Sequence, residues 1–371
     1  MNSKKIMHIV GARPNFMKVA PIMREMRKYP NKFTQILVHT GQHYDQSMSE
    51  VFFSDLDIPR PDINLGVGSG SHANQTAQIM LRFESVLIEN RPDWVVVVGD
   101  VNSTIACALV CSKLGIRVAH VEAGLRSFDR TMPEEINRIL TDQISDLFFT
   151  TEESANENLL REGIPKEKIY FVGNVMIDTL IHSLPKTNSR PIVQELGLLK
   201  GDKQAEITSY ILVTMHRPSN VDESETLKEF VTTLIELSKC IPVIFPIHPR
   251  IKRQISDMNL QTSASLMILD PLGYLDFLTL MKHAKLVLTD SGGIQEETTY
   301  LGVPCLTVRP NTERPVTLSK GTNRLVKNER SLIINACHEI INDMKPQDSE
   351  RELPELWDGL AAKRIVQVLL K

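Results

Sequence analysis

The chain has 371 residues, of which 42% are hydrophobic and 23% charged, and its formal net charge at neutral pH is −3. This length exceeds what one core supports and predicts two domains. A near-neutral balance without a basic stripe argues against a nucleic acid or a membrane surface as a partner. No run approaches the ~20 apolar residues of a membrane helix, and Gly11 and Pro14 break the short apolar run near the N-terminus. We therefore expect a cytoplasmic protein.

Short β-branched runs alternate with amphipathic stretches through the first half of the chain. The runs are KIMHIV, FTQILVHT, WVVVVGD, RVAHVEA and LFFTT. Strands that are covered by helices on both faces have such continuous apolar sequences, so the alternation is typical of parallel βαβ units. The first half is therefore predicted to form a doubly wound α/β domain.

The same alternation starts again after a Pro/Ser/Asn-rich stretch at 183–191, with the runs SYILVT, PVIFPIH, SLMILD, LVLTD and VPCLTV. We predict an α/β protein of two doubly wound, Rossmann-like domains that span 1–175 and 176–355, with a final helix at about 356–371. In open sheets of this kind, ligands bind beyond the carboxyl ends of the strands. The polar residues that follow each strand are therefore the candidates for a functional site.

The turn after the first strand carries two basic residues. Gly11 permits a tight turn, and Arg13 and Lys18 at the start of the next helix would meet an anion together with free backbone amides. A solvated pair of surface charges is the alternative. The position after the first strand favours an anion site.

The run WVVVV is followed by an aspartate, Asp100. Asn102, Ser103 or Thr104 can cap the next helix, so Asp100 is not needed as the cap. It is then a free carboxylate at the carboxyl end of a strand, unless it is an ordinary turn aspartate.

The stretch HVEAGLRSFDRTMPEEINR, residues 120–138, contains three glutamates. Glu122 follows a strand, whereas Glu134 and Glu135 follow Pro133 in the first turn of a helix, where they suit the helix dipole. Glu134 is expected to point away from the buried face, and the dipole alone would explain one of the two helical acids. We expect the buried face to consist of the apolar positions Ile136, Ile139, Leu140 and Leu147.

Histidines and small residues follow the strands of the second half. His216 and His248 come after two strands; a lone histidine is more often structural, but two at equivalent strand ends favour an anionic ligand. The segment Asp290–Glu297, DSGGIQEE, combines small residues, a helix start and acids one turn later. A Gly-Gly turn without a ligand is the alternative, but the pattern predicts a phosphate cradle beside a ribose site. The loop TERP, residues 312–315, adds a charge.

Together these motifs resemble the non-hydrolysing UDP-N-acetylglucosamine 2-epimerase family. The matching segments, in order, are GARPNFMKVAP, HTGQHYDQSM, GDVNST, AHVEAGLRS with PEEINR, GNVMIDT, LVTMHRP, LTDSGGIQEE and TERP. The resemblance implies the GT-B type of two-domain fold, with the active site in the interdomain cleft and the final helix packed back on the first domain. It also implies reversible conversion of UDP-N-acetylglucosamine into UDP-N-acetylmannosamine by elimination of UDP, a 2-acetamidoglucal intermediate and re-addition, without NAD or metal, in a homodimer.

The resemblance assigns roles to the matching positions. Asp100, Glu122 and Glu134 would be the acid and base groups, and His216 would hold the UDP leaving group. Gln42, His43 and Gln46 match a region that binds a second UDP-N-acetylglucosamine as an activator in some bacterial members. The substrate-binding positions would be Arg13, Lys18, Arg138, His248, Phe277, Ser291, Gly292, Gly293, Glu297 and Arg314.

Departures from the family pattern leave other functions open. Pro218 and Ser219 stand where many members have a glutamate, and PLGY at 271–274 replaces the commoner uracil segment PQEY. A sister activity, 2-epimerisation of UDP-2,3-diacetamido-glucuronic acid, would place its carboxylate near Arg130 or Arg250. A GT-B glycosyltransferase would leave Glu122 and Glu134 idle, and a UDP-sugar-binding protein would need none of the first-domain acids.

Overall fold

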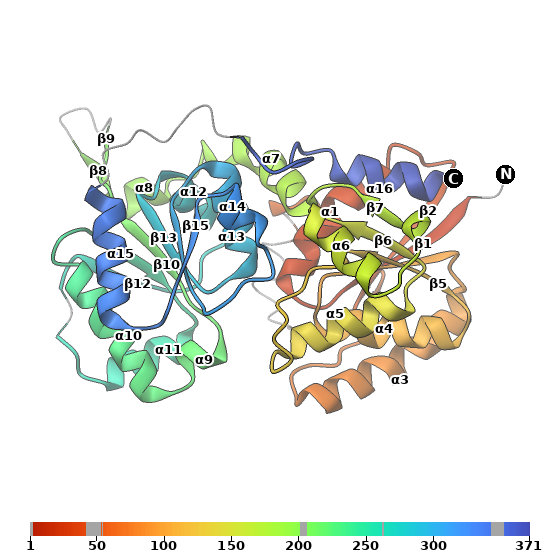
Figure 1. Cartoon of the computed structure of the whole chain (residues 1–371), viewed down its shortest axis with the longest axis horizontal. Helices are drawn as coiled ribbons and strands as arrows, with labels where there is room; N and C mark the ends of the chain where they lie inside the picture. Colours follow the sequence, from red (N-terminus) through yellow and green to blue (C-terminus); the bar gives the residue numbers. More distant parts are fainter. Residues whose placement is uncertain (1–2, 42–52, 54, 201–205, 262, 343–351) are drawn as a thin grey trace. The chain divides into compact units, whose positions relative to one another are not determined.

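The computed structural model describes residues 3–41, 53, 55–200, 206–261, 263–342 and 352–371. The chain forms two compact units (Figure 1). The first unit comprises Met1–His182 and Glu355–Lys371, and the second comprises Ser183–Pro354. The division falls within one continuous helix, α7 (Val175–Thr187), seven residues beyond the expected end of the first domain at residue 175.

The first unit alternates strands and helices along the chain. Its strands are β1 (Lys4–Val10), β2 (Phe33–His39), β3 (Ile63–Asn64), β4 (Trp94–Val98), β5 (Arg117–Val121), β6 (Leu147–Thr150) and β7 (Ile169–Phe171). Its helices are α1 (Arg13–Met26), α3 (His72–Asn90), α4 (Asn102–Lys113), α5 (Pro133–Ile144), α6 (Glu153–Arg161), the short 3₁₀ helix Lys166–Lys168, the first part of α7, and α16 (Ala361–Leu370).

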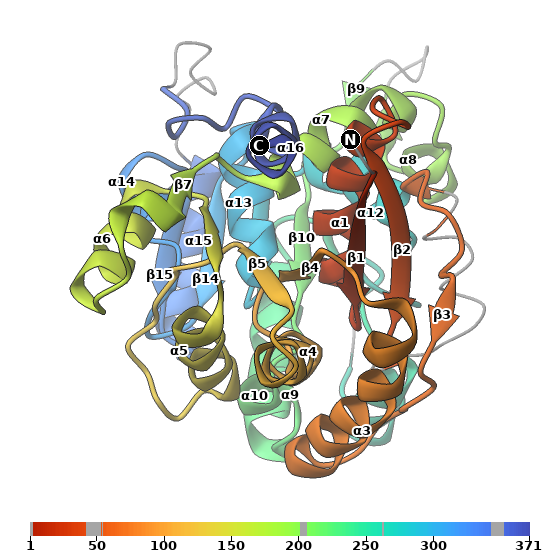
Figure 2. The same cartoon turned by 90° about the vertical axis from the view of Figure 1, so that its right-hand side faces the viewer.

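These strands form one parallel sheet in the order β3-β2-β1-β4-β5-β6-β7. Helices α3, α4 and α5 lie on one face, and α1 and α16 lie on the other (Figure 2). All five residues of β4 are buried because helices cover both faces, as its unbroken apolar run predicts. The strand order reverses between the neighbouring strands β1 and β4. The chain leaves β1 toward β2 on one side of this point and leaves β4 toward β5 on the other.

The second unit repeats this plan. Its strands are β8 (Leu199–Lys200), β9 (Glu206–Ile207), β10 (Ile211–Thr214), β11 (Val243–Pro246), β12 (Leu266–Leu269), β13 (Leu286–Thr289), β14 (Cys305–Val308) and β15 (Asn323–Val326). Its helices are α8 (Ile192–Glu195), α9 (Pro218–Val221), α10 (Ser224–Leu237), α11 (Pro249–Asp257), α12 (Tyr274–His283), α13 (Gly292–Leu301), α14 (Val316–Ser319) and α15 (Arg330–Asn342).

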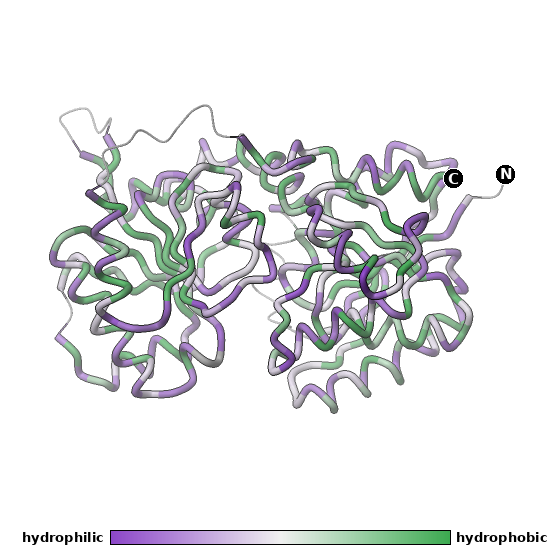
Figure 3. The backbone as a smooth tube through the Cα atoms, viewed as in Figure 1, coloured by the Kyte–Doolittle hydropathy of each residue, from purple (hydrophilic) through white to green (hydrophobic). Residues whose placement is uncertain are grey.

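The second parallel sheet has the order β12-β11-β10-β13-β14-β15, and it reverses between β10 and β13. Its buried core joins β10, β11 and β13 to helices α10 and α15. Figure 3 shows the hydrophobic strands inside each unit and hydrophilic residues along the outer helices and loops. The predicted α/β class with two parallel sheets is therefore confirmed. Among the described residues, no helix is both long and apolar enough to cross a bilayer.

The final helix α16 begins on a carboxylate of α7. Asp178 accepts hydrogen bonds from the backbone amides of Ala361 (3.2 Å) and Ala362 (2.7 Å), which belong to the first turn of α16. A helix leaves these amides without partners of its own, so Asp178 serves as a cap from a distant part of the chain. Burial nevertheless raises the pKa of Asp178 to about 6, because the two amide bonds offset only part of the desolvation.

This cap predicts a pH dependence of stability. A carboxyl with a raised pKa in the folded state contributes stability below its ordinary pKa and loses it as pH rises through about 6. Relative to Asp178→Asn, the free energy of unfolding of the wild type should fall by on the order of 3 kcal/mol from about pH 4 to pH 7. Both tryptophans, Trp94 and Trp357, lie in the first unit, so their fluorescence in urea follows this unit. Parallel pH curves for the two proteins would contradict the prediction.

Candidate functional site

The charged residues singled out by sequence gather where each sheet reverses its strand order. In the first unit, β1 and β4 are neighbours; Gly11 follows β1, Lys18 lies in the next helix α1, and Gly99 and Asp100 follow β4. In the second unit, β10 and β13 are neighbours, and their loops carry His216 and Asp290–Gly293. Diverging crossovers leave room for a ligand at such points. Each unit therefore has one group of polar side chains in the position where open α/β sheets bind ligands.

Lys18 and Glu122 form the innermost pair of the first unit. The Lys18 Nζ lies 2.8 Å from Glu122 Oε1 and 2.7 Å from Oε2, and the residues are 5% and 1% exposed. Lys18 comes from α1 and Glu122 from the end of β5, so tertiary folding brings together charges 104 positions apart. Glu122 has φ of 68°, a left-handed backbone that is costly for a residue with a side chain. The fold holds this carboxylate in a specific place against local preference.

Gly99 allows the close approach of this pair to β4. A Cβ at position 99 would lie 2.8 Å from the Lys18 Nζ and 3.8 Å from Glu122 Oε1. Gly99 also has φ of 65°, which disfavours any side chain. The glycine before Asp100 is therefore required both by the backbone and by the space that Lys18 fills.

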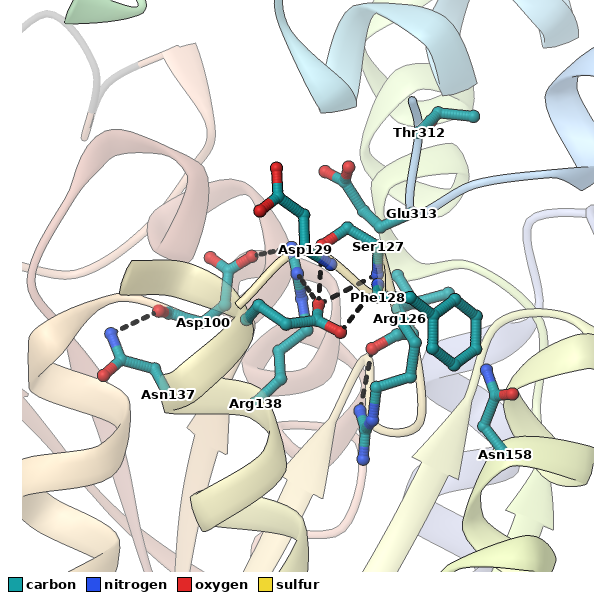
Figure 4. A network of polar contacts seen from close by, with 12 residues as sticks. Asp100, Arg126, Ser127, Phe128, Asp129, Asn137, Arg138, Asn158, Thr312 and Glu313 are labelled. Atoms are coloured by element: carbon teal, nitrogen blue, oxygen red, sulfur yellow. Dashed lines mark hydrogen bonds and ion pairs between the residues drawn. The ribbon is translucent and has the colours of Figure 1, made fainter. Parts of the chain in front are cut away.

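Asp100 is ion-paired and is not the free carboxylate that its sequence suggests. Arg138 of α5 reaches its Oδ2, and the Asn137 side chain donates a 2.8 Å hydrogen bond to its backbone carbonyl (Figure 4). None of Asn102, Ser103 and Thr104 is the N-cap of α4; the cap residue is Val101, without a side-chain bond. Arg138, expected to bind substrate, thus holds Asp100 in this structure.

Glu135 binds the loop that precedes α5, a contact that the dipole interpretation did not include. It is 1% exposed and accepts 2.9 Å hydrogen bonds from the Ser127 amide, the Ser127 hydroxyl and the Phe128 amide. It also lies 3.1 Å from Arg138, so the loop after Glu122 is fixed to the residue that pairs with Asp100.

The prediction that α5 buries an apolar face is wrong. Ile136 and Ile139 are half-buried, Leu140 is 49% exposed, and Leu147 begins β6 rather than continuing the helix. The buried residues of α5 are the polar ones, Glu135, Arg138, Thr141 and Asp142. They recur at helical spacing and meet the polar turns after β4 and β5. The helical spacing of Glu135, Arg138 and Asp142 in the sequence was the signal that could have indicated a polar buried face.

A second network beneath these turns was not identified from sequence. His120 of β5 is fully buried; its Nδ1 lies 2.7 Å from Asp142 Oδ1 and its Nε2 lies 2.9 Å from the Gly99 carbonyl. Asp142 also accepts bonds from Arg126 (2.7 Å) and from the Gly124 amide (3.1 Å). Burial raises the pKa of Asp142, but the charge and hydrogen bond of His120 and those of Arg126 outweigh it and hold the pKa below its usual value.

The structure assigns less to two further candidates of the first unit. Glu134 is half-buried on the first turn of α5, one helical turn before Arg138, and no hydrogen bond or ion pair within the described residues fixes its carboxylate. Arg13 is exposed at the first position of α1. The Glu134 carboxylate therefore remains accessible to a ligand.

Asp290 organises the histidine turn of the second unit. It is fully buried and lies 2.8 Å from His216 Nδ1. Its carboxylate also accepts bonds from the amides of His216 (3.1 Å) and Arg217 (2.9 Å) and from the Asn220 side chain (3.0 Å). Burial raises the pKa of Asp290, but these bonds outweigh it, so that the pKa lies below its usual value. The His216 side chain is 62% exposed, and Asp290 fixes which ring nitrogen faces outward.

Ser291, Gly292 and Gly293 open helix α13 directly after Asp290, and Ser291 makes no side-chain cap. Arg314 lies against this helix start: a Cβ at Gly292 would be 2.4 Å from its Nη1. Its Nε donates to Glu296 (2.7 Å) and its Nη1 to Glu313 (2.5 Å). A helix N-terminus with small residues and a guanidinium suits a phosphate. The predicted cradle and the predicted arginine are thus brought together.

Glu297 lies one turn farther along α13 and is 2% exposed. Its Oε1 accepts a 2.8 Å hydrogen bond from Tyr274 of α12, a partner that sequence did not suggest. Burial raises the pKa of Glu297 to about 8; the Tyr274 bond opposes this and the charge of Glu296 adds to it. The carboxyl is thus held in the second turn of α13, in an environment that disfavours its charge.

The remaining candidates are less well placed. His248 is exposed at the N-cap of α11, where its side chain accepts a 3.2 Å bond from the Arg250 amide. Within the described chain, no hydrogen bond or ion pair joins it to the start of α13. Phe277 is half-buried on α12, one turn after Tyr274. Gln42, His43 and Gln46 lie outside the described residues.

The two groups support different chemistry. The first unit offers carboxylates held at defined positions, which is what proton transfer requires. The second offers amides, a guanidinium and an oriented imidazole, which bind and stabilise a phosphate-like anion.

Comparison with known proteins gives a consistent result. Residues 24–370 match the family model described as UDP-N-acetylglucosamine 2-epimerase. A protein of Methanocaldococcus jannaschii named UDP-N-acetylglucosamine 2-epimerase is 42% identical, with 98% of each chain covered. A Pseudomonas aeruginosa protein named UDP-2,3-diacetamido-2,3-dideoxy-D-glucuronate 2-epimerase is 38% identical, with 99% of each chain covered.

Solved structures show the same similarity. The M. jannaschii UDP-GlcNAc 2-epimerase in complex with UDP-GlcNAc and UDP has a TM-score of 0.88 at 42% identity, covering 98% of this chain and 99% of that one. The Neisseria meningitidis enzyme bound to UDP-GlcNAc has a TM-score of 0.88 at 32% identity, covering 99% of each chain.

Proposed function

Because the chain belongs to the UDP-N-acetylglucosamine 2-epimerase family, we propose that it interconverts UDP-N-acetylglucosamine and UDP-N-acetylmannosamine by inverting C2. It is thus an isomerase, and the glycosyltransferase and binding-protein alternatives lose their support. The observation that carries the proposal most directly is Glu122, a carboxylate that is buried, held by Lys18 and placed at a strand end in a left-handed backbone. A fold does not need such an acid.

The proposed reaction begins with loss of UDP. A base takes the C2 proton, the C2–H electron pair forms the C1=C2 bond of 2-acetamidoglucal, and the C1–O pair leaves with UDP. Re-addition of UDP with a proton delivered to the opposite face of C2 completes the inversion. The C2 proton is not next to a carbonyl, so departure of UDP must precede or accompany its removal, and the diphosphate must be stabilised.

The acids of the first unit would serve the two faces of C2. Glu122 is proposed as the main proton-transfer group, oriented by Lys18. Asp100, held by Arg138, and Glu134, the more accessible acid, would supply the other proton transfers. Proton transfer on the two faces of C2 requires more than one acid or base group. Several carboxylates can therefore take part in one reaction.

The second unit would hold the leaving group. The amides at the start of α13 and Arg314 suit the diphosphate, and His216, oriented by Asp290, would stabilise the charge that develops on it. Phe277 would lie toward the uracil, and His248 would contribute to binding the anionic diphosphate. No step in this scheme uses a metal or a nicotinamide cofactor.

Glu297 is proposed to accept hydrogen bonds from the ribose hydroxyls. We therefore expect substrate binding to depend on pH. A carboxylate accepts at both oxygens, whereas the protonated form loses acceptor capacity. With a pKa of about 8 in the free protein, the carboxylate population grows as pH rises from 6.5 to 8.5, and Kd should fall about tenfold. Calorimetry with UDP-N-acetylglucosamine in a Glu122→Gln background measures this. Glu297→Gln should bind more weakly with a flat profile, and a flat wild-type profile would contradict the prediction.

The similarity to the P. aeruginosa relative leaves one alternative substrate for this chain, UDP-2,3-diacetamido-glucuronic acid. Arg250, one of two expected partners for its carboxylate, forms an exposed 2.7 Å ion pair with Asp222, and Arg130 is exposed. Incubating the protein separately with both UDP-sugars and following the C2 epimers by NMR decides between them. Conversion of the diacetamido-glucuronate alone would overturn the assigned substrate.

We also propose the homodimer that the resemblance implies. Several large apolar side chains are exposed on α3, on α5 and just after α4, Ile88 and Leu114 line one shared depression, and exposed apolar surface favours an interface. They are Leu81, Ile88, Leu114 and Leu140. Sedimentation velocity tests this directly, and a monomer at micromolar concentration would refute it. The cytoplasmic location stays a prediction.

A further inference from the structure

Gly99 links the two strands that present Asp100 and Glu122. Its N–H donates a 3.0 Å hydrogen bond to the Val121 carbonyl, and its own carbonyl lies 2.9 Å from His120 Nε2. Asp100 follows Gly99 directly, and Glu122 follows Val121. Hydrogen bonds at this one residue therefore tie together the two strand ends that carry the acids, and His120 supplies the side-chain contact.

The surroundings of His120 define its hydrogen bonds. Nε2 faces the Gly99 carbonyl oxygen and Nδ1 faces the Asp142 carboxylate, so both nitrogens face acceptors. A ring that donates at Nε2 holds the Gly99 carbonyl, and Asp142 anchors the ring at Nδ1.

Asp142 is itself held in place by Arg126. The Arg126 guanidinium contacts two carboxylates, the buried Asp142 at 2.7 Å and the partly exposed Glu162 at 2.6 Å. The same Asp142 accepts the Gly124 amide, so the cluster also fixes the chain on the far side of Glu122.

We propose that His120 is a positioning residue for the proton transfer: anchored on Asp142, it holds the Gly99 carbonyl and thereby the placement of Asp100 relative to Glu122. The inference rests on the proposed roles of these two acids. His120 touches no reacting atom. It acts through the backbone that carries them.

Two substitutions separate the contacts of His120. The amide of Gln reaches the position of Nε2, so His120→Gln keeps a donor to the Gly99 carbonyl; the amide of Asn reaches the position of Nδ1, so His120→Asn keeps only the donor to Asp142. In the full-length protein, we expect His120→Asn to lower kcat for UDP-N-acetylglucosamine about 10²-fold with KM unchanged, since misplacement by about 1 Å has such a cost. His120→Gln should retain at least tenfold more activity.

Equal kcat losses in the two variants, or losses that follow their urea midpoints by tryptophan fluorescence, would overturn the proposal. Should both variants fail to fold, ¹⁵N NMR of the wild type decides: a protonated Nε2 of His120 supports the clamp, and an unprotonated Nε2 refutes it. Glu122→Gln, measured in parallel, isolates the underlying function. If it exchanged the C2 proton at the wild-type rate, the role of Glu122 would fail, whereas the NMR result would still decide the state of His120.

Discussion

Replacing Glu122 by glutamine is expected to lower kcat about 10³-fold, because general acid–base groups contribute roughly 10² to 10⁴ to rate. The amide keeps the shape of the side chain and can still bond to neighbours, but it cannot accept a proton at neutral pH. Binding of UDP should be unchanged, since the proposed diphosphate contacts belong to the second unit. Exchange of the C2 proton, followed by NMR in D2O, measures the first effect and calorimetry with UDP the second.

A matched control lies in the same unit. Glu157 forms an exposed ion pair with Arg161, so Glu157→Gln removes a carboxylate at the surface and should leave exchange unchanged. If Glu122→Gln exchanged as fast as Glu157→Gln, Glu122 would not be the proton-transfer residue.

Replacing His216 by alanine is expected to lower kcat by roughly 10² to 10³, because it removes a donor that stabilises charge developing on the leaving diphosphate. Affinity for UDP should fall as well. The fold should remain, since the side chain is largely exposed and Asp290 keeps its bonds to the Arg217 amide and to Asn220. Steady-state kinetics and UDP calorimetry give the two effects.

The control is His338→Ala, which removes an exposed histidine from α15 of the same unit. It should retain wild-type kcat and UDP affinity. A His216→Ala variant with the kcat of this control would exclude His216 from handling the leaving group.

The sheets were predictable because parallel strands covered on both faces leave unbroken apolar runs, as in β4. Short strands escaped this signal. β3 has only Ile63 and Asn64, and β7 has no buried residue, so neither contains a recognisable run. The two compact units divide after His182, within α7, which enters the Pro/Ser/Asn-rich stretch and ends at Thr187.

The position of the site was predictable from strand ends, whereas the partners of its residues were not. Lys18 and Glu122 were both candidates, yet only folding shows that they form a pair. Asp290 and Tyr274 look ordinary in sequence, and they matter because they contact His216 and Glu297. On α5, apolar periodicity favoured the wrong face, because the polar turns after β4 and β5 bury Glu135, Arg138 and Asp142 instead.

The most direct test of the proposed reaction is incubation of the wild-type protein with UDP-N-acetylglucosamine in D2O. Removal and return of the C2 proton through the carboxylates predicts deuterium at C2 in both UDP-N-acetylglucosamine and UDP-N-acetylmannosamine as the two interconvert. Formation of UDP-N-acetylmannosamine that keeps its original C2 hydrogen, or no reaction at all, would contradict it.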